Sequence, residues 1–437
     1  MDICSKLQSI EPQEGFYLLH TDNALIKLCF VTDEIVRIRA SFDKDLAEES
    51  YILLTTAWED RLDPLFAGER TRLTPVKAGL KETEDAVFFS TAEVTLRVDR
   101  DPLNFTLCDA DGNILYRALS GCPFVKDSNG RVIAYSEMKE DDCFYGFGEK
   151  AGLLNKNKKF LRERATDAMG YDPEYTDTLY KHVPFYLRLD RDTHKAVGVF
   201  YHNFYESVFN MGCEKSNYWH RYSYFQADGG DIDCFLIGGD TIPRIVDNYT
   251  MLTGRPCLLP KRALGYQASS MYYPELEKDC DDAIYDFVDT IRENDFPVDG
   301  FHLSSGYTSY NNKRCVFTWN TTRFKDPQKY LRTMKEQHAQ NVPNVKPGIL
   351  LCHPYFADFE RAGVFVQDSH DQDTYGVGRW WGGDGAFWDF TSPQARALWK
   401  KYLTDAIIDV GTDSVWNDNC EYDSLMDKDC RCNFDGK

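Results

Sequence analysis

Two carboxylates and a tryptophan lie close together near the C-terminal end of the chain. They are Trp416, Asp418 and Glu421, within the stretch Trp-Asn-Asp-Asn-Cys-Glu. An indole ring can stack on the apolar face of a sugar, and a carboxylate can attack or stabilise the oxocarbenium-like carbon of a glycoside. This spacing favours carbohydrate-cleaving chemistry; the alternative is a polar loop that happens to hold two acids and a tryptophan.

These side chains need a regular element to position them. Residues 407–415 change from apolar to polar, which is typical of a short buried strand. A helix is predicted over residues 392–410, because Ser392 followed by Pro393 is a helix start signal. This helix leads toward Trp416, so we expect Asp418 and Glu421 to project from the C-terminal end of a strand.

The same alternation of strands and helices extends back to about residue 260. Four such repeats indicate a parallel α/β sheet with right-handed crossovers. The long loops after the second and third strands, rich in Tyr, Trp, Gly and Asp, lie where a (β/α)8 TIM barrel builds its site. A closed barrel needs eight strands, so we expect a fragment with the barrel truncated after about four. The predicted strands are 263–268, 298–303 and 345–351 before that of Trp416, and the earlier helices are 279–294 and 327–339.

Residues from about 10 to 250 have a different pattern. Short runs of β-formers, such as 24–31, 35–39, 92–98 and 196–200, are separated by turn residues at intervals that fit an antiparallel β-sandwich. The predicted fold is therefore α/β with an all-β N-terminal domain. We expect the sandwich over residues 1–255 and the first half of a (β/α)8 barrel over 256–437.

Composition narrows the possible partners and location. A formal net charge of −20 opposes binding to nucleic acid or an anionic membrane surface, and no apolar run approaches the length of a membrane span. Several of the 14 cysteines, including Cys29, Cys234 and Cys352, sit in apolar runs where a free thiol acts as a small hydrophobe. The first residues have no apolar region typical of a signal peptide. These features predict a reduced, cytoplasmic protein without metal or cofactor.

Several separated motifs resemble glycoside hydrolase family 31, the α-glucosidase and α-xylosidase family. The resemblance covers nearly the whole chain and implies a galactose-mutarotase-like sandwich followed by a catalytic barrel. The motifs, in order, are Phe144–Lys150, Ala165–Asp167 with Leu179–Tyr186, Trp381–Gly383 with Asp389–Pro393, and Trp416–Glu421.

This resemblance implies a retaining mechanism on a terminal α-linked glucose or related hexose of an oligosaccharide. Asp418 would be the nucleophile that forms a glycosyl-enzyme, with Glu421 supporting it by hydrogen bonding. In the family the acid/base comes from a later barrel strand, beyond Lys437. On this basis we expect the chain alone to have little or no turnover.

The expected substrate contacts come from both domains. Trp381 and Trp416 would wall the sugar pocket, with a core position as the alternative for each. Asp167 would reach a sugar hydroxyl from a sandwich loop, unless it is a plain turn residue, and Glu149 and Lys150 are interpreted as structural. The remaining candidate substrate-binding residues are Ser304, Tyr307 and His353.

One departure from the family pattern concerns specificity. After the second barrel strand the glucosidases carry Asp-Ile-Asp-Tyr, whose first Asp binds a sugar hydroxyl, whereas this chain has Ser304-Ser305-Gly306-Tyr307. A neutral hydroxyl is a weaker partner than a carboxylate. An α-glucosyltransferase or α-N-acetylgalactosaminidase of the same family, or a noncatalytic carbohydrate-binding remnant, therefore stays open. The oligomeric state is open too, with a homo-oligomer as one possibility.

Overall fold

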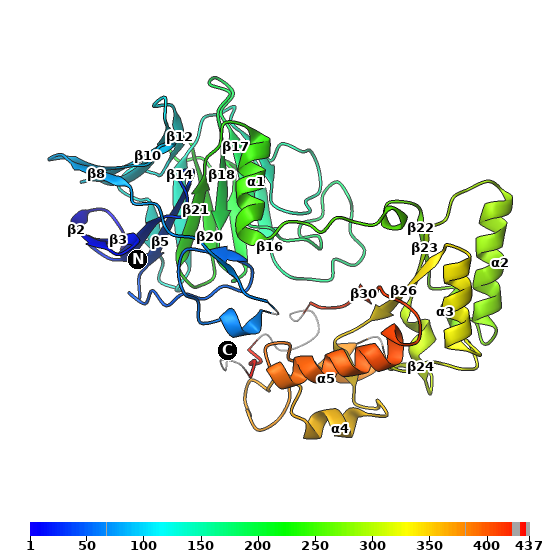
Figure 1. Cartoon of the computed structure of the whole chain (residues 1–437). Helices are drawn as coiled ribbons and strands as arrows, with labels where there is room; N and C mark the ends of the chain where they lie inside the picture. Colours follow the sequence, from blue (N-terminus) through cyan, green and yellow to red (C-terminus); the bar gives the residue numbers. More distant parts are fainter. Residues whose placement is uncertain (67, 381, 422–428, 434–437) are drawn as a thin grey trace. The chain divides into compact units, whose positions relative to one another are not determined.

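The computed structural model describes all residues except 67, 381, 422–428 and 434–437. The chain divides into two compact units, Met1–Pro256 and Cys257–Lys437. In Figure 1 the first unit runs from blue to green and the second from green to red. The first is built from antiparallel sheets and the second from parallel strands that alternate with helices, which confirms the predicted fold class.

In its described residues the first unit has three large sheets, a short two-stranded sheet and one α-helix. In the three large sheets all strand pairs are antiparallel. The eight-stranded sheet has the order β15 (Cys143–Gly146), β17 (Phe185–Leu189), β18 (Ala196–Tyr201), β21 (Ile232–Ile237), β5 (Ile35–Ser41), β4 (Leu25–Phe30), β3 (Phe16–Thr21) and β2 (Leu7–Gln13). The six-stranded sheet has the order β1 (Asp2–Ile3), β13 (Phe124–Lys126), β14 (Val132–Glu137), β20 (Tyr222–Ala227), β19 (Ser207–Asn210) and β16 (Phe160–Glu163). The five-stranded sheet comprises β12 (Ile114–Arg117), β11 (Leu103–Asp109), β10 (Val94–Arg100), β9 (Ala86–Ser90) and β8 (Gly79–Glu82). The short strands β6 (Thr55–Thr56) and β7 (Thr71–Arg72) pair in parallel, and helix α1 spans Ile242–Thr253.

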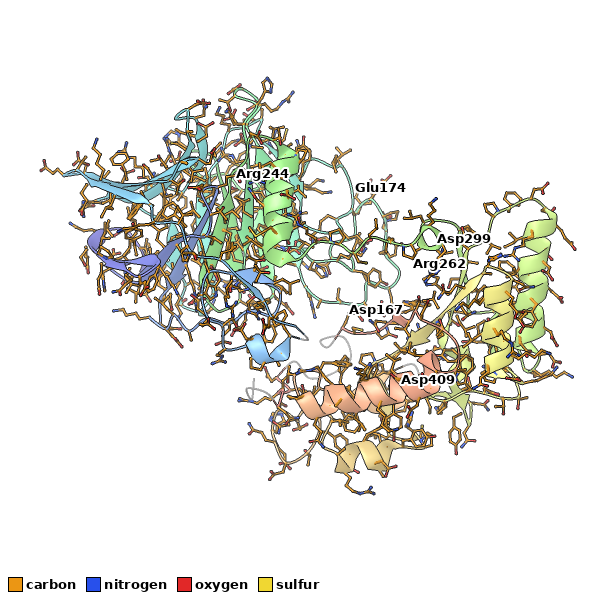
Figure 2. The ribbon with its side chains drawn as sticks, in the orientation of Figure 1. Asp167, Glu174, Arg244, Arg262, Asp299 and Asp409 are labelled. Atoms are coloured by element: carbon orange, nitrogen blue, oxygen red, sulfur yellow. The ribbon has the colours of Figure 1, made fainter. Side chains whose placement is uncertain are left out.

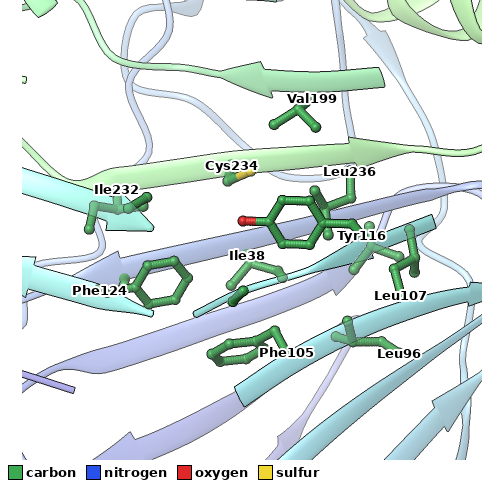
Figure 3. Packing of buried hydrophobic residues seen from close by; sticks show 14 of the residues in the cluster. Ile38, Leu96, Phe105, Leu107, Tyr116, Phe124, Val199, Ile232, Cys234 and Leu236 are labelled. Carbon is green, nitrogen blue, oxygen red and sulfur yellow. The ribbon is translucent and has the colours of Figure 1, made fainter. Parts of the chain in front are cut away.

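The core of this unit is formed by alternate side chains of its strands. Along β10, Val94, Leu96 and Val98 are buried, whereas the side chains between them are more exposed. Figure 3 shows Leu96 facing the same core as residues of β5, β11 and β21. Burying one such aliphatic or aromatic side chain contributes about 1.5–3 kcal/mol, so this core is the main stabilising element of the unit.

The second unit contains a four-stranded parallel sheet. Its order follows the chain: β22 (Gln267–Ser270), β23 (Gly300–Leu303), β26 (Gln340–Val345) and β30 (Trp416–Asn417). The intervening helices are α2 (Cys280–Glu293), α3 (Pro327–Glu336), α4 (Phe356–Arg361) and α5 (Pro393–Leu403), which continues as a π-turn over Thr404–Ile408. Parallel neighbours joined through helices are the arrangement of the first half of a TIM barrel.

Local signals explain where two of these helices begin. The side chains of Asp326 and Ser392 accept hydrogen bonds from backbone amides three residues ahead, and a proline follows each cap. Such caps satisfy amides that have no partner within the helix. Both helix starts agree with the predicted positions.

The third parallel strand differs from the prediction. It is Gln340–Val345, whereas the predicted strand 345–351 contributes only β27 (Gly348–Leu350) to a separate antiparallel sheet with β29 (Gly383–Phe387) and β28 (Val377–Trp380). The apolar run after Pro347 gave the stronger sequence signal. β26 is polar, but its buried Asn341 finds a partner outside the strand: its side-chain amide donates to the Tyr330 hydroxyl at 2.6 Å.

The predicted strand over 407–415 was also wrong. Ile407 lies in the π-turn and packs into the core of this unit, and the chain then turns at Gly411, whose φ is +139°. The apolar residues therefore belong to the end of a helix. Similarly, the first strand is Gln267–Ser270, while Lys261–Ala263, at the start of the predicted strand 263–268, form a 3-10 turn.

Two further hairpin strands, β24 (Ser309–Tyr310) and β25 (Lys313–Arg314), lie between β23 and α3.

Cys29 and Cys234 are buried free thiols as their apolar runs predict, and burial raises the pKa of Cys29 to about 11. Cys352, in contrast, is exposed.

In the described part of the chain, no helix has the length and apolar character to cross a bilayer. Nor do its His, Cys, Asp and Glu side chains form a group that could hold a metal ion.

Candidate active site

Two of the predicted site residues directly follow strands of the parallel sheet: Ser304 follows β23 and Asp418 follows β30. Lys346, which was not among the predicted site residues, follows β26. The carboxyl ends of parallel strands lie at one edge of a sheet, where TIM barrels place their catalytic groups. This edge of the second unit is therefore the candidate site.

Asp418 is held at this edge by both its backbone and its side chain. Its amide donates to the carbonyl of Val345 at 3.0 Å, extending the pairing of β26 with β30. Its Oδ2 accepts a 2.8 Å hydrogen bond from Nδ2 of Asn344 and forms an ion pair with Lys346. The side chain is 28% exposed, and among the described residues no hydrogen bond reaches Oδ1. One carboxylate oxygen is thus fixed and the other is open.

Lys346 links this carboxylate to the neighbouring residue. Its ammonium contacts both Oδ2 of Asp418 and Oδ1 of Asn419, and its side chain is only 14% exposed. An ion pair in such a partly buried place is stronger than one in open solvent. A lysine beside Pro347, at the start of an apolar stretch, was a usable sequence signal. Nothing in the sequence marked Asn344.

Two rings of this sheet contact each other. The ring centroids of His302, on β23, and Trp416, on β30, are 6.1 Å apart in an edge-on arrangement. Burial lowers the pKa of His302, which favours its neutral form. Trp416 is partly buried, so the indole packs against the protein while retaining surface that a sugar could contact.

Ser304 and Tyr307 occupy different positions at the end of β23. Ser304 is 6% exposed, and its Oγ has no hydrogen-bond partner in the described structure. Tyr307 is fully buried, and its hydroxyl donates to the carbonyl of Asn344 at 2.8 Å. Tyr307 thus supports the residue that holds Asp418, and a direct contact of either side chain with substrate stays a prediction.

The remaining predicted site residues of this unit have no hydrogen bond to Asp418 among the described contacts. His353 is buried; its Nε2 lies 2.7 Å from the carbonyl of Val316, and its Nδ1 accepts from the amide of Tyr355 at 3.1 Å. Both ring nitrogens are therefore used by the backbone. Glu421 has its Oε2 buried without a hydrogen-bond partner in the structure described. Trp381 lies outside the described residues.

Asp167 belongs to the first unit. Figure 2 shows it with Glu174 on the long loop between β16 and β17. Its Oδ1 accepts from the hydroxyl of Tyr180 at 2.9 Å. The same loop is fastened by Glu149, whose amide donates to the carbonyl of Lys181 at 2.8 Å and whose Oε2 accepts from the amide of Tyr180. Glu149 therefore acts structurally within this unit.

The neighbouring Lys150 fastens the loop from its other end. Its ammonium lies 3.2 Å from Glu163 and 3.4 Å from Asp177, and its side chain is 1% exposed. Asp177 also accepts from the amide of Arg162 at 2.7 Å. The motif Phe144–Lys150 thus ties down the loop that carries Asp167.

Comparison with known sequence families identifies both halves of the chain. Residues 25–210 match the glycosyl hydrolase 31 N-terminal galactose mutarotase-like domain, and residues 256–436 match the TIM-barrel domain of glycosyl hydrolases family 31. The chain belongs to glycoside hydrolase family 31.

Family 31 relatives and structures show how much of such a protein is present. The chain is 29% identical to alpha-glucosidase 2 of Bacillus thermoamyloliquefaciens over 93% of its own length and 47% of the relative's. It is 26% identical to the alpha-glucosidase of Saccharolobus solfataricus over 68% of its length and 40% of the relative's. The structure of a Flavobacterium johnsoniae GH31 dextranase mutant complexed with isomaltotriose superposes with a TM-score of 0.82 at 22% identity, covering 95% of this chain and 48% of the dextranase. The chain thus spans about half the length of these family 31 proteins or less.

Proposed function

We propose that this chain is part of a retaining α-glycoside hydrolase that removes terminal α-linked glucose, or a related hexose, from oligosaccharides. The observation that carries the proposal is the position of Asp418, with Oδ2 held by Asn344 and Lys346 and Oδ1 without a hydrogen-bond partner among the described residues. The similarity to two α-glucosidases supports the choice of an α-linked sugar.

In this proposal Oδ1 of Asp418 attacks the anomeric carbon while the glycosidic bond breaks and the leaving oxygen takes a proton from a second carboxylic acid. The product is a glycosyl ester, in which Oδ2 becomes the carbonyl oxygen and keeps its hydrogen bonds from Asn344 and Lys346. Water then attacks the same carbon, gives its proton to the second carboxyl group and releases Asp418. Retaining enzymes place these two carboxyl groups about 5–5.5 Å apart. The family resemblance assigns the second acid to a strand beyond Lys437.

A transferring enzyme is the second candidate, and Ser304 is the observation that favours it. At the position where glucosidases of the family carry a sugar-binding aspartate, this protein has a buried hydroxyl without a partner in the structure described. A neutral group binds a hexose hydroxyl more weakly than a carboxylate does, so the site would discriminate less between hexoses. A sugar hydroxyl would then take the place of water in the second step, or the hexose would be N-acetylgalactosamine.

The test uses the full-length protein and release of p-nitrophenol from p-nitrophenyl α-glycosides. Asp418→Ala should lower kcat by at least about a thousandfold, because no covalent intermediate can form. Added azide should restore part of the rate by occupying the space of the lost carboxylate and yield a glycosyl azide. The matched control is Asp409→Ala, at an exposed position of the same unit (Figure 2), which should keep full activity.

Undiminished release by Asp418→Ala would remove Asp418 from the chemistry. If the wild-type full-length protein instead binds oligosaccharides without releasing p-nitrophenol, the noncatalytic reading is correct. A panel with gluco, galacto, xylo and N-acetylgalactosamino substrates identifies the hexose. Adding an acceptor sugar and analysing the products separates hydrolysis from transfer.

A further inference from the structure

A second hollow with sugar-binding chemistry lies in the first unit, on the loop of residues 211–221 between β19 and β20. Its volume is about 240 Å³. We call it the Trp219 hollow; the lining residues that matter are Glu140, Glu214, Trp219, His220, Arg221 and Tyr222. All belong to the sandwich unit, and none takes part in the proposed catalysis.

The indole of Trp219 is held rigidly although it is 44% exposed. Its ring centroid lies 5.7 Å from that of Tyr135 and 5.6 Å from that of Tyr222, in edge-on contacts with interplanar angles of 74° and 79°. The Oγ of Ser216 accepts a 3.1 Å hydrogen bond from the backbone amide of Trp219. A fixed, exposed indole offers a binding surface with little loss of side-chain entropy on binding.

The hollow also presents fixed hydrogen-bond acceptors. Oε1 of Glu214 accepts from the hydroxyl of Tyr224 at 2.8 Å, and Oε2 accepts from that of Tyr222 at 3.3 Å. Each carboxylate oxygen has further lone pairs, so Glu214 can accept from a ligand without losing these bonds.

Arg221 supplies the donors. Its Nη2 lies 3.5 Å from Oε1 of Glu140, and its Nη1 is buried without a hydrogen-bond partner among the residues described. Because Nη1 is buried, the donors open to a ligand are the other N–H groups of this guanidinium, whose side chain is 20% exposed. The hollow therefore has carboxylate acceptors and a guanidinium donor beside an apolar ring.

We propose that the Trp219 hollow is a second carbohydrate-binding site, which holds one unit of a neutral oligosaccharide on the first unit. Every sugar hydroxyl both donates and accepts, which suits Glu214 and Arg221, and the opposite charges of these side chains give no preference for an ionic ligand. The hollow is smaller than the roughly 300–1,000 Å³ of a drug-sized site, so it fits a single ring stacked on Trp219. This site goes beyond the proposed function. Only the choice of an α-linked glucose oligosaccharide as the ligand rests on that proposed function.

The test is ¹⁹F NMR on the full chain labelled with 5-fluorotryptophan and titrated with isomaltotriose. Trp219→Phe and Trp416→Phe assign the two relevant resonances. All titrations use the Asp418→Ala background, so that turnover cannot deplete the ligand. The Trp219 resonance should shift in a saturable way at millimolar sugar. Because it reports on its own site, it responds whether or not Trp416 does, and a failure of the proposed function is distinguishable from a failure of this site.

Variants then identify the contacts by isothermal titration. Trp219→Ala should weaken binding at this site by about tenfold or more, because the stacking surface is lost. Glu140→Gln, whose side chain is 73% exposed and which cannot disturb the core, should weaken it severalfold by loosening Arg221. Phe204→Ala is the matched control, since Phe204 is 50% exposed and outside the hollow; it should leave binding unchanged. A Trp219 resonance that stays fixed with isomaltotriose, maltotriose and an N-acetylhexosamine disaccharide alike would overturn the proposal.

Discussion

The side-chain amide of Asn344 donates a 2.8 Å hydrogen bond to Oδ2 of Asp418, joining the ends of two parallel strands. We predict that Asn344→Ala in the full-length enzyme lowers kcat/KM by about 10- to 100-fold, since a hydrogen bond to a charged group is worth about 1.5–3 kcal/mol. The measurement is the rate of p-nitrophenol release under subsaturating substrate.

The control for this prediction lies on the same strand. Asn341→Ala removes a buried amide that donates to the Tyr330 hydroxyl and does not contact Asp418. It should lower the free energy of unfolding while leaving kcat/KM of the folded enzyme nearly unchanged. Equal activities of the Asn344 variant and wild type would show that the carboxylate needs no such support.

Ser304 allows stability and substrate binding to be separated. Its buried hydroxyl has no hydrogen-bond partner in the described structure, so Ser304→Ala should not lower the free energy of unfolding and should raise it by roughly 1 kcal/mol. If the hydroxyl binds a sugar, kcat/KM should fall about 2- to 10-fold, the value of a neutral hydrogen bond. Thermal unfolding and kinetics on the same preparation measure both.

Ser309→Ala is the control variant, in which stability should fall while catalysis is unaffected. The Oγ of Ser309 donates to the carbonyl of Gly306 at 2.9 Å and accepts from Arg323 at 3.0 Å. Its loss should therefore cost about 1 kcal/mol of stability without a specific effect on kcat/KM. A drop in stability for Ser304→Ala as large as that for Ser309→Ala would mean that the Ser304 hydroxyl is not idle.

The sequence predicted the elements better than their polar contacts. Capped helices such as those starting at Pro327 and Pro393 follow from local signals, because a cap and a proline act within one turn. The strand Gln340–Val345 was missed because its asparagines look unsuited to burial until their partners are known. Tyr330 lies close in sequence to Asn341, but Asp418 is 74 residues from Asn344.

The candidate site shows the same division. Asp418 was predicted at the end of a strand and does follow one, but that strand is only Trp416–Asn417 and not the apolar stretch 407–415 from which it was predicted. How three strand ends meet determines that Oδ2 of Asp418 is held, whereas its Oδ1 and the Ser304 hydroxyl have no hydrogen-bond partner in the part of the chain that the structure describes. Such contacts arise from the fold and leave no local pattern in the sequence.

A buried ion cluster in the first unit predicts acid sensitivity. Arg37 donates to both carboxylate oxygens of Asp233 at 2.7 Å and also pairs with Glu48 at 2.9 Å. Burial acts to raise the pKa of Asp233, but the charge and hydrogen bonds of Arg37, with a further contribution from His202, outweigh it and hold that pKa well below its usual value. The same opposing effects leave the pKa of Glu48 lowered.

A folded-state pKa below the unfolded value gives stability that is present above the unfolded pKa and lost as pH falls through the folded pKa. The free energy of unfolding should therefore decline below about pH 4, where unfolded Asp and Glu begin to take up protons. Asp233→Asn should cost about 3–5 kcal/mol at neutral pH, because it leaves Arg37 buried with less compensation, and the deficit should shrink in acid. Urea unfolding across this range measures it. Asp111→Asn, whose side chain is 82% exposed, should have almost no effect; equal losses would refute the role of the cluster.

Gly148 lies within the motif Phe144–Lys150, which fastens the loop that carries Asp167. Its φ is +71°, and a Cβ at this position would fall on the carbonyl oxygen of Lys181. Gly148→Ala should therefore cost the strain of a left-handed residue, about 1–2 kcal/mol, plus the displacement of the loop backbone. Gly130→Ala is the matched control. Gly130 has a φ of +84°, but a Cβ at this position would have nothing within 4 Å, so this substitution costs only the backbone strain. Denaturant unfolding of both variants isolates the close approach as the difference. In the full-length enzyme Gly148→Ala should also raise KM if Asp167 binds substrate, whereas Gly130→Ala should not; identical stability losses would mean that the loop yields to the added methyl group and that the glycine is needed only for its backbone angle.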